Sequence, residues 1–358
     1  MQKNFHLSIV ATSRNDNHGG SLTKRMQHFV DGFVAQCIRH DLQAELILVE
    51  WNPPPENVPL KEVLRFPKDR GPSEIRIITV PRELHDKLKH AESLPLFQMI
   101  GKNVGIRRAL GNYVLATNID ILFSDAIMQF LKKNLDEKFL YRTDRVDIPS
   151  ELPENSSWEE ILHFAEQNAF RINGKNSTVI KRNGQFVPTI AKKSLLQRLE
   201  KLKKIRQKNI FKSITNYYLH YQKRKHLNHL HTNACGDFTL LSKQHWQTLR
   251  GYPEWEMYSW HIDSILLYQA HFHDIPQMNL PQDHCVYHIE HHVGSGFTPE
   301  NANALFDRLR QQNIGFIDDN ALHQLFVDMM EKRKKGEKVF FNAEDWGWRD
   351  IVLHEEWV

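Results

Sequence analysis

Two polar residues, Asn118 and Asp120, directly follow the apolar segment 113–117, which is typical of a buried strand. A carboxylate at a strand end, two residues after another polar side chain on the same face, can bind Mg²⁺ or Mn²⁺ through hard oxygen ligands. Such ions typically take one or two protein carboxylates and leave their remaining positions to substrate phosphates. The pattern therefore predicts a divalent cation at Asp120. The alternative is that Asp120 caps a helix beginning near Ser124.

A second set of side chains that can bind a metal lies in the segment 287–292, which contains three histidines and one glutamate. His288 and His292 are four residues apart and would share one face of a helix, which makes a zinc site conceivable. The glutamate spacing differs from that of the HExxH zinc motif, however, and the glycines at 294 and 296 favour a loop. The alternative at each position is an ordinary hydrogen-bonded histidine.

Alternating strands and helices in the first 140 residues must position these side chains. Four apolar runs are typical of strands: 5–11, 44–51, 75–80 and 113–117. Apolar residues at helical spacing separate them, notably over 22–40 and 97–110. This alternation implies βαβ units and a mostly parallel sheet, and ligands of such sheets bind beyond the carboxyl ends of the strands. Besides Asn118 and Asp120, the polar residues expected there are Thr12, Arg14, Asn15, Asp16 and Glu50.

Residues 101–107, the Gly111-Asn112-Tyr113 turn and the strand leading into Asn118-Ile119-Asp120 together resemble the nucleotide-sugar glycosyltransferases of the GT-A fold, of the family 2 type. In that superfamily an Asn/Arg- and Gly-rich helix and a GxY turn precede the strand that carries an Asp-x-Asp motif. The resemblance covers roughly residues 5–130, with weaker echoes from 234 to 295. One departure is that Asn118 stands where the first aspartate is usual, which lowers the negative charge of the site.

The resemblance implies a GT-A (Rossmann-like) α/β fold with a mostly parallel central sheet flanked by helices. It implies metal-dependent transfer of a sugar from a nucleotide sugar, a UDP-sugar in the first place, to a carbohydrate or glycolipid acceptor. The implied donor-binding residues are Thr12, Arg14, Asp16, Glu50, Lys102, Asn103, Arg107 and Asn118. Thr12, Asp16 and Glu50 would hold the uracil and ribose, whereas Lys102, Asn103 and Arg107 would lie near the ribose and diphosphate. Turn, cap or solvated helix positions are their alternatives.

For the metal, Mn²⁺ or Mg²⁺, the resemblance implies Asp120 together with His288 or His291. For the chemistry it implies a carboxylate that removes the acceptor proton, with Asp263 at the start of a helix as the base and Asp237 as its competitor. This arrangement favours an inverting enzyme, although a retaining one stays open. The alternative role for Asp263 is that of an N-cap.

The middle of the chain differs from this pattern. Between 192 and 225, twelve lysines and arginines accompany one acid, Glu200, beside an apolar and aromatic stripe. We expect one or two basic amphipathic helices, which either touch an anionic membrane or pack on the core with a solvated basic face. The expected organisation is a nucleotide-sugar-binding half, a helical basic insertion, an acceptor-side catalytic half and a helical C-terminal extension, at 1–141, 142–231, 232–300 and 301–358. The paired indoles of Trp346 and Trp348 are expected to pack on the core or to form a lid.

Composition limits the other classes of protein. The 358 residues are 41% hydrophobic and 25% charged, which suits a globular enzyme, and the net charge of +4 does not require a nucleic-acid partner. Three distant cysteines exclude a disulfide scaffold. We expect no leader and no membrane span, and a cytoplasmic protein with peripheral contact at the inner face of a membrane left open. Two alternative functions remain: a nucleotidyltransferase, suggested loosely by Gly19-Gly20 before Lys24-Arg25, and a nucleic-acid-binding protein acting through the basic insertion.

Overall fold

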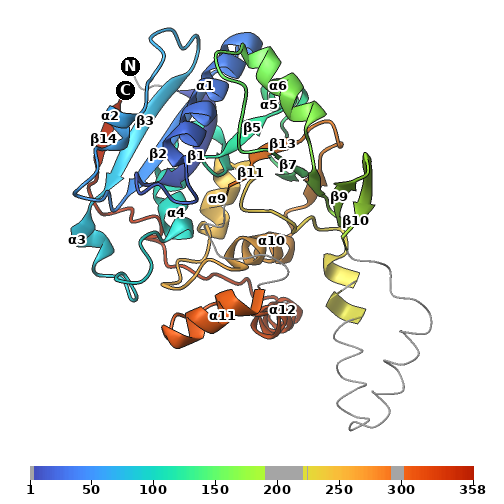
Figure 1. The fold of residues 1–358 in the computed structure, drawn as a ribbon. Helices are drawn as coiled ribbons and strands as arrows, with labels where there is room; N and C mark the ends of the chain where they lie inside the picture. The colour runs from blue at the N-terminus through green and yellow to red at the C-terminus, as the bar shows by residue number, and fades with distance from the viewer. Residues whose placement is uncertain (1–3, 190–220, 224, 292–301) are drawn as a thin grey trace.

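A computed structural model describes residues 4–189, 221–223, 225–291 and 302–358 (Figure 1). Its larger sheet has eight strands in the order β12-β6-β11-β4-β1-β2-β3-β14. The expected α/β class, with a large central sheet flanked by helices, is confirmed. Most of the basic stretch 192–225, and with it the expected membrane contact, lies outside the described residues.

Four parallel strands form the centre of the sheet: β1 (Phe5–Ser13), β2 (Ala44–Trp51), β3 (Glu74–Val80) and β4 (Gly111–Ala116). All eight residues of β2 are buried, which explains the nearly continuous apolar run in its sequence, since a central parallel strand is covered on both faces. The remaining strands of this sheet are β6 (Leu140–Arg142), β11 (Thr239–Ser242), β12 (Gln277–Asn279) and β14 (His354–Trp357).

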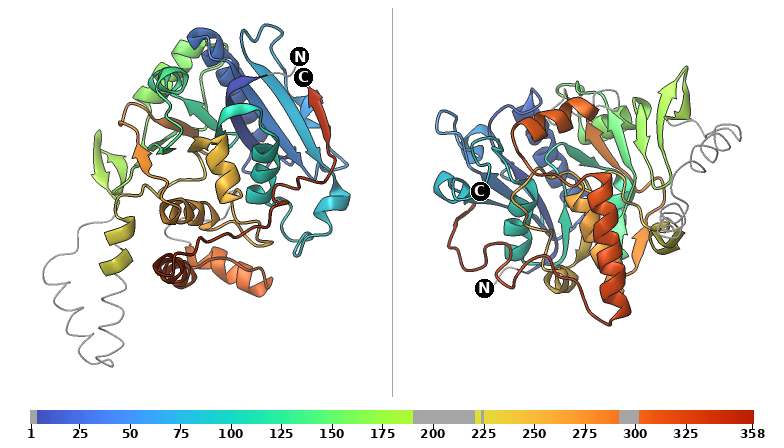
Figure 2. Two further views of the ribbon diagram at one scale, coloured as in Figure 1. Left: turned by 180° about the vertical axis from the view of Figure 1, so that it is seen from behind. Right: turned by 90° about the horizontal axis from the view of Figure 1, so that it is seen from below.

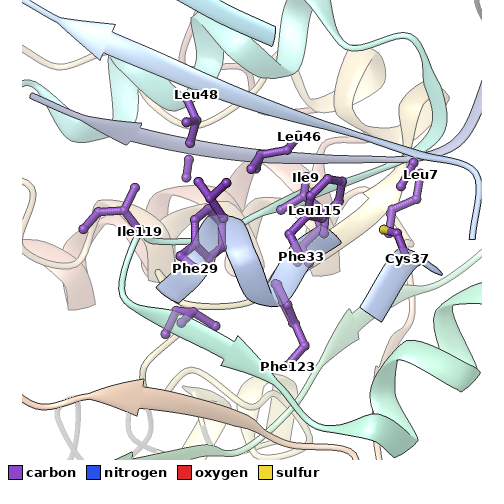
Figure 3. Close-up of a cluster of buried hydrophobic side chains, with 14 of the residues drawn as sticks. Leu7, Ile9, Phe29, Phe33, Cys37, Leu46, Leu48, Leu115, Ile119 and Phe123 are labelled. Atoms are coloured by element: carbon purple, nitrogen blue, oxygen red, sulfur yellow. The ribbon is translucent and has the colours of Figure 1, made fainter. Parts of the chain in front are cut away.

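Helices cover both faces of the central sheet (Figures 1 and 2). On one face lie α1 (Leu22–His40) and α5 (Asp125–Lys133), and Figure 3 shows Phe29 and Phe33 of α1 between the central strands and Phe123. On the other lie α4 (Gln98–Arg108), α9 (Lys243–Leu249) and α10 (Ile262–Phe272). The apolar positions that predicted α1 and α4 are the ones that face the sheet. Short helices α2 (Leu60–Val63) and α3 (Arg82–His85) follow β2 and β3.

A second sheet corrects the expectation of a helical insertion at 142–231. Its strands are β5 (Ile121–Phe123), β7 (Arg145–Ile148), β8 (Arg171–Asn173), β9 (Thr178–Arg182), β10 (Gln185–Pro188) and β13 (Val286–Ile289), with α6 (Trp158–Gln167) packed beside them. The overlooked signal was Asn183-Gly184, where both residues have positive φ, as a tight hairpin turn between β9 and β10 requires.

The C-terminal extension is helical only in its first part, α11 (Ala302–Gln311) and α12 (Asp319–Lys334). The chain then runs back across the α4 side of the molecule and ends as β14, antiparallel to β3 at the sheet edge. Trp346 is buried, and the Trp348 ring lies 5.3 Å from that of Trp51, so the two indoles pack on the core. Within the described ranges, no helix has the length and apolar character needed to cross a bilayer.

Candidate active site

Asp120 lies where the chain passes from β4 of the large sheet to β5 of the second sheet. The Thr117 amide donates to the Val10 carbonyl at 2.9 Å, and the Ile289 amide donates to the Asp120 carbonyl at 2.9 Å. These bonds fix the backbone on either side of the Asp120 side chain, which is almost fully buried. Asp120 does not cap the following helix, because Ser124 accepts from the Ile127 amide and is itself the N-cap of α5.

Two histidines from the end of β13 and the residues after it face Asp120. His291 Nε2 lies 3.1 Å from Asp120 Oδ2, and His288 Nε2 lies 3.7 Å from the same oxygen. Asp120, His288 and His291 each offer one ligand atom, and these three atoms all lie within 4.8 Å of one another. The other oxygen, Asp120 Oδ1, is buried and accepts no hydrogen bond from any described residue. A carboxylate oxygen left without a partner beside two imidazoles fits a divalent cation, and imidazole donors favour Mn²⁺ over Mg²⁺.

The charges of this group are strongly coupled. Burial by itself raises the pKa of Asp120, but His288, His291 and Arg25 outweigh it and hold that pKa well below its usual range. Burial likewise disfavours the charged form of His288, yet the carboxylates of Asp120 and Asp147 raise the pKa of the imidazole. The pocket therefore keeps its carboxylate ionised, which is the state that a metal ligand needs.

Arg25 belongs to this site and was not among the expected site residues. Its Nη1 donates to Asp120 Oδ2 at 3.0 Å, and its Nη2 donates to the carbonyls of His18 and Gly20. Gly19 has a φ of +73°, and a Cβ there would lie 2.6 Å from His291 Nδ1, so the loop closes over the site only with glycine. The Gly19-Gly20 pair before Lys24-Arg25, read loosely as a nucleotidyltransferase feature, was the signal in the sequence.

Asn118 joins the group of Asp120, His288 and His291 to the second half of the chain. Its Oδ1 accepts from Lys102 Nζ and Gln98 Nε2, each at 2.8 Å, and its Nδ2 donates to Asp237 Oδ1. Lys102 also donates to the Gly236 carbonyl at 2.8 Å, and burial, partly offset by Asp237 and its neighbour Asp263, lowers the pKa of this amine to about 8. An aspartate at 118 would set a second carboxylate against Asp237.

Replacing Asn118 by aspartate is expected to make stability fall with rising pH. The new carboxyl and Asp237 would share one proton, so the folded-state pKa of the pair is raised and the folded protein binds more protons than the unfolded one. The unfolding free energy relative to the wild type should drop between pH 4 and pH 8 by roughly 1.4 kcal/mol for each unit of that shift, because the loss begins at the unfolded-state pKa of about 4. Urea denaturation at both pH values measures this. Asn118→Ala, which adds no charge, should show no such slope; equal slopes for the two variants would contradict the explanation.

Asp237 and Asp263 lie on either side of Gly236 but differ in how their oxygens are engaged. Asp237 accepts from Asn118 through Oδ1 and pairs with Arg145 Nη1 at 2.9 Å through Oδ2. Asp263, near the start of α10, accepts from the Ser264 amide through Oδ1. A Cβ at Gly236 would lie 3.1 Å from Asp263 Oδ2, so this oxygen faces the bare backbone of the glycine. Of the two, only Asp237 forms an ion pair among the described residues.

The residues expected to hold the base and ribose are divided between the two faces of the sheet. Thr12 faces α4, and its buried Oγ1 has no hydrogen-bond partner among the residues described. Glu50 pairs in register with Ser13, so its side chain lies on the opposite face, where Oε1 accepts from the Leu60 amide at 2.7 Å and burial raises the pKa of the carboxyl. Arg14 and Asp16 pair with each other at 3.5 Å in the loop after β1. The structure does not bring Glu50 together with Thr12.

Gly101 gives the Thr12 side chain its space, which leads to a stability prediction. A Cβ at Gly101 would lie 2.5 Å from Thr12 Cγ2, so we expect Gly101→Ala to lower the unfolding free energy by about 1–3 kcal/mol through overpacking. Gly315→Ala is the matched control, because its Cβ would make an ordinary 3.5 Å contact with Met257. Urea denaturation of both variants compares them, and equal losses would refute the packing argument.

Two residues expected to bind the donor have side chains that are engaged away from Asp120. Asn103 donates to the Tyr252 carbonyl and to Glu254 and accepts from the Tyr252 amide, so its amide is fully used in fixing the loop after α9. Arg107 donates to Gln247 at 2.7 Å, and its guanidinium lies 4.9 Å from the Trp346 ring centre. Because α4 runs back from the carboxyl ends of the strands, its later residues lie away from the site. The expectation that these two contact ribose and diphosphate is therefore corrected.

No family model and no curated protein matches the sequence. Among solved structures, the chain is similar to a crystal structure of GalNAc-T7 with UDP, GalNAc and Mn²⁺, at 13% identity and a TM-score of 0.40, over 98% of this chain and 57% of that one. It is also similar to S. aureus TarS 1–349 in complex with UDP-GlcNAc, at 10% identity and a TM-score of 0.43, over 92% of this chain and 73% of that one. In a longer structure of S. aureus TarS the match spans 44% of that chain. The chain thus spans about half the length of the larger structures that it matches.

Proposed function

We propose that this chain is a GT-A-fold glycosyltransferase that transfers a sugar from a UDP-sugar to a carbohydrate or glycolipid acceptor with the help of a divalent cation. The observation that carries the proposal is the group formed by Asp120, His288 and His291, with one carboxylate oxygen left without a partner at the carboxyl end of β4. Asn118 follows β4 two residues before Asp120 and donates to Asp237, and Asp263 lies beyond Gly236, so cation, donor and acceptor functions would meet at one edge of the sheet.

The cation would be held by Asp120, His288 and His291, and two imidazole ligands fit Mn²⁺ better than Mg²⁺. When bound, a divalent ion offsets the negative charge that grows on a departing diphosphate. The chain adds positive charge of its own, since Arg25 and Lys102 are both buried within reach of the same carboxylates. A diphosphate would therefore enter a site whose cationic groups are already desolvated and fixed, which strengthens their attraction for it.

For the donor, we assign Thr12, Arg14 and Asp16 to the uridine side. Thr12 offers a buried hydroxyl with no protein partner in the described chain, and such a group is ready to bond a ligand. Asp16 and Arg14 lie in the loop directly after β1, which is where ligands of a parallel sheet bind. Glu50, Asn103 and Arg107 have no place in this assignment, because their side chains are engaged elsewhere.

For the acceptor, we assign Asp263 as the base. Its Oδ2 lies against Gly236, where the absence of a side chain lets the carboxylate sit close to the backbone. A carboxylate there would take the proton of an acceptor hydroxyl while that oxygen attacks the anomeric carbon from the side opposite the diphosphate. Attack from that side gives inversion. Asp237 is the weaker candidate, because Asn118 and Arg145 already occupy both of its oxygens.

A calorimetric screen of UDP-, GDP- and CMP-sugars with and without Mn²⁺ tests the proposal. We expect binding of at least one UDP-sugar that weakens tenfold or more when the metal is removed. Binding of no nucleotide sugar under either condition would refute the proposal. The second candidate, a nucleotidyltransferase, is favoured by Arg25 on Asp120 just after the glycine pair, and predicts instead that a nucleoside triphosphate and a sugar 1-phosphate release pyrophosphate.

A further inference from the structure

Asp147 is a fully buried carboxylate beside the proposed metal-binding group of Asp120, His288 and His291. It has no part in the proposed transfer reaction. Arg145 Nε lies 2.9 Å from its Oδ1, Asn173 Nδ2 donates to its Oδ2 at 2.9 Å, and Arg171 Nε pairs with the same Oδ2. The fourth partner is His288, whose Nδ1 lies 3.1 Å from Oδ1. A buried carboxylate with four polar partners is held in one position and orientation.

Strand register places this carboxylate behind the histidine. In the second sheet β13 runs parallel to β7 and antiparallel to β5, so that His288 is paired with Asp147 on one side and with Ile121 on the other. Asp120 immediately precedes Ile121. The imidazole is thereby held through Nδ1 by Asp147, while its Nε2 points to Asp120 Oδ2.

A second cation on Asp147, His288 and Glu290 is the competing interpretation, since their ligand atoms also lie close together. Two arginines argue against it. Arg171 Nη2 lies 2.6 Å from Glu290 Oε2, and both Arg145 and Arg171 pair with Asp147. Both oxygens of Asp147 are therefore engaged, and Arg171 already neutralises Glu290. Asp120 differs, because Arg25 pairs only with its Oδ2 and Oδ1 has no partner among the described residues.

We propose that Asp147 is a positioning residue for the metal-binding group: by holding His288 through Nδ1, it directs Nε2 into the space shared with Asp120 and His291. A histidine that binds a metal through one ring nitrogen usually donates a hydrogen bond from its other ring N–H to such a carboxylate, which fixes the ring and raises its basicity. This inference rests on the proposed function for the existence of the metal site, but it concerns a residue outside that site.

Mn²⁺ titration of the full chain, followed by the electron paramagnetic resonance signal of the free ion, tests the role. Asp147→Asn should weaken Mn²⁺ binding roughly 10–100-fold. Asp144→Asn is the matched control, because Asp144 makes a similar 2.9 Å contact with His231 that leads away from the site, and it should change binding less than twofold. Asp147→Asn binding as tightly as the wild type would overturn the inference. If instead the wild type binds no Mn²⁺, or Asp120→Asn does not weaken the binding, the proposed function itself fails.

A second measurement does not depend on whether Asp147→Asn folds. In the metal-free wild type, the Nδ1–H of His288 should exchange slowly with water, because it is buried against a carboxylate. Nuclear magnetic resonance of protein labelled with ¹⁵N-histidine should therefore show a persistent imidazole N–H signal that disappears in His288→Gln. Absence of any such signal from the folded wild type would overturn the positioning role, whatever the Mn²⁺ titration gives.

Discussion

Replacing Asp120 by asparagine is expected to lower sugar transfer by about 10³-fold or more and to abolish the effect of Mn²⁺ on nucleotide binding. The amide keeps the shape of the side chain but removes the charge that faces His288 and His291. Stabilisation of a developing charge by a bound metal amounts to several kcal/mol, and about 4 kcal/mol corresponds to a 10³-fold change in rate. Initial rates and calorimetric titration of UDP with and without Mn²⁺ measure the two effects. Full activity in this variant would rule out the role given to Asp120.

The same substitution should also change stability in a way that depends on pH. The Arg25 guanidinium loses its buried counter-charge, which costs about 3–5 kcal/mol at neutral pH. Because the folded-state pKa of Asp120 lies well below the unfolded value, its contribution is present above about pH 4 and is lost as the pH falls towards the folded-state pKa. The difference in unfolding free energy between wild type and variant should therefore narrow on acidification below about pH 4. A constant difference down to pH 2 would show that Asp120 is not the paired carboxylate.

The second large effect is expected at Asp263. Asp263→Asn should reduce kcat by about 10²–10⁴-fold, the range for loss of a general base, while the dissociation constant of the UDP-sugar changes less than threefold. The reason is position: Asp263 faces Gly236 rather than the residues assigned to the donor. Single-turnover rates and donor titrations separate the two quantities. Loss of donor binding in Asp263→Asn would move the residue to the donor side.

Asp237 provides the comparison for this experiment. Asp237→Asn removes one of the two carboxylates paired with Arg145 and weakens a hydrogen-bond acceptor of Asn118, so it should lower the unfolding free energy as well as the rate. Asp263 forms no ion pair in the described structure, although its charge acts on the buried Lys102 and Arg142, so its variant should lose less unfolding free energy than Asp237→Asn. A fall in kcat confined to Asp237→Asn would identify Asp237 as the base instead.

Much of the central sheet could be predicted from the sequence because its signals are local. A strand or helix that is buried on one or both faces needs apolar residues at a fixed spacing within its own segment. The first four strands show this as apolar runs, and α1 and α4 show it as helical spacing. Asn118 and Asp120 at the end of β4 follow from the same reasoning. The second sheet was missed because β5, β7, β8 and β13 are only three or four residues long, too short for a periodic pattern.

What the sequence determined by itself is therefore the class of sheet and the identity of its strand-end aspartate, together with two histidines near residue 290 that could serve it. The tertiary structure decided which side chains meet. It brought Arg25 and Asp147 to the site and took Arg107 away from it. It also placed the Asn118 amide against the carboxylate of Asp237. These contacts join residues that are distant in the sequence; Asp147 and His288, for example, are 141 positions apart. Strand register and helix direction fix such contacts, and no local pattern of residue types encodes them.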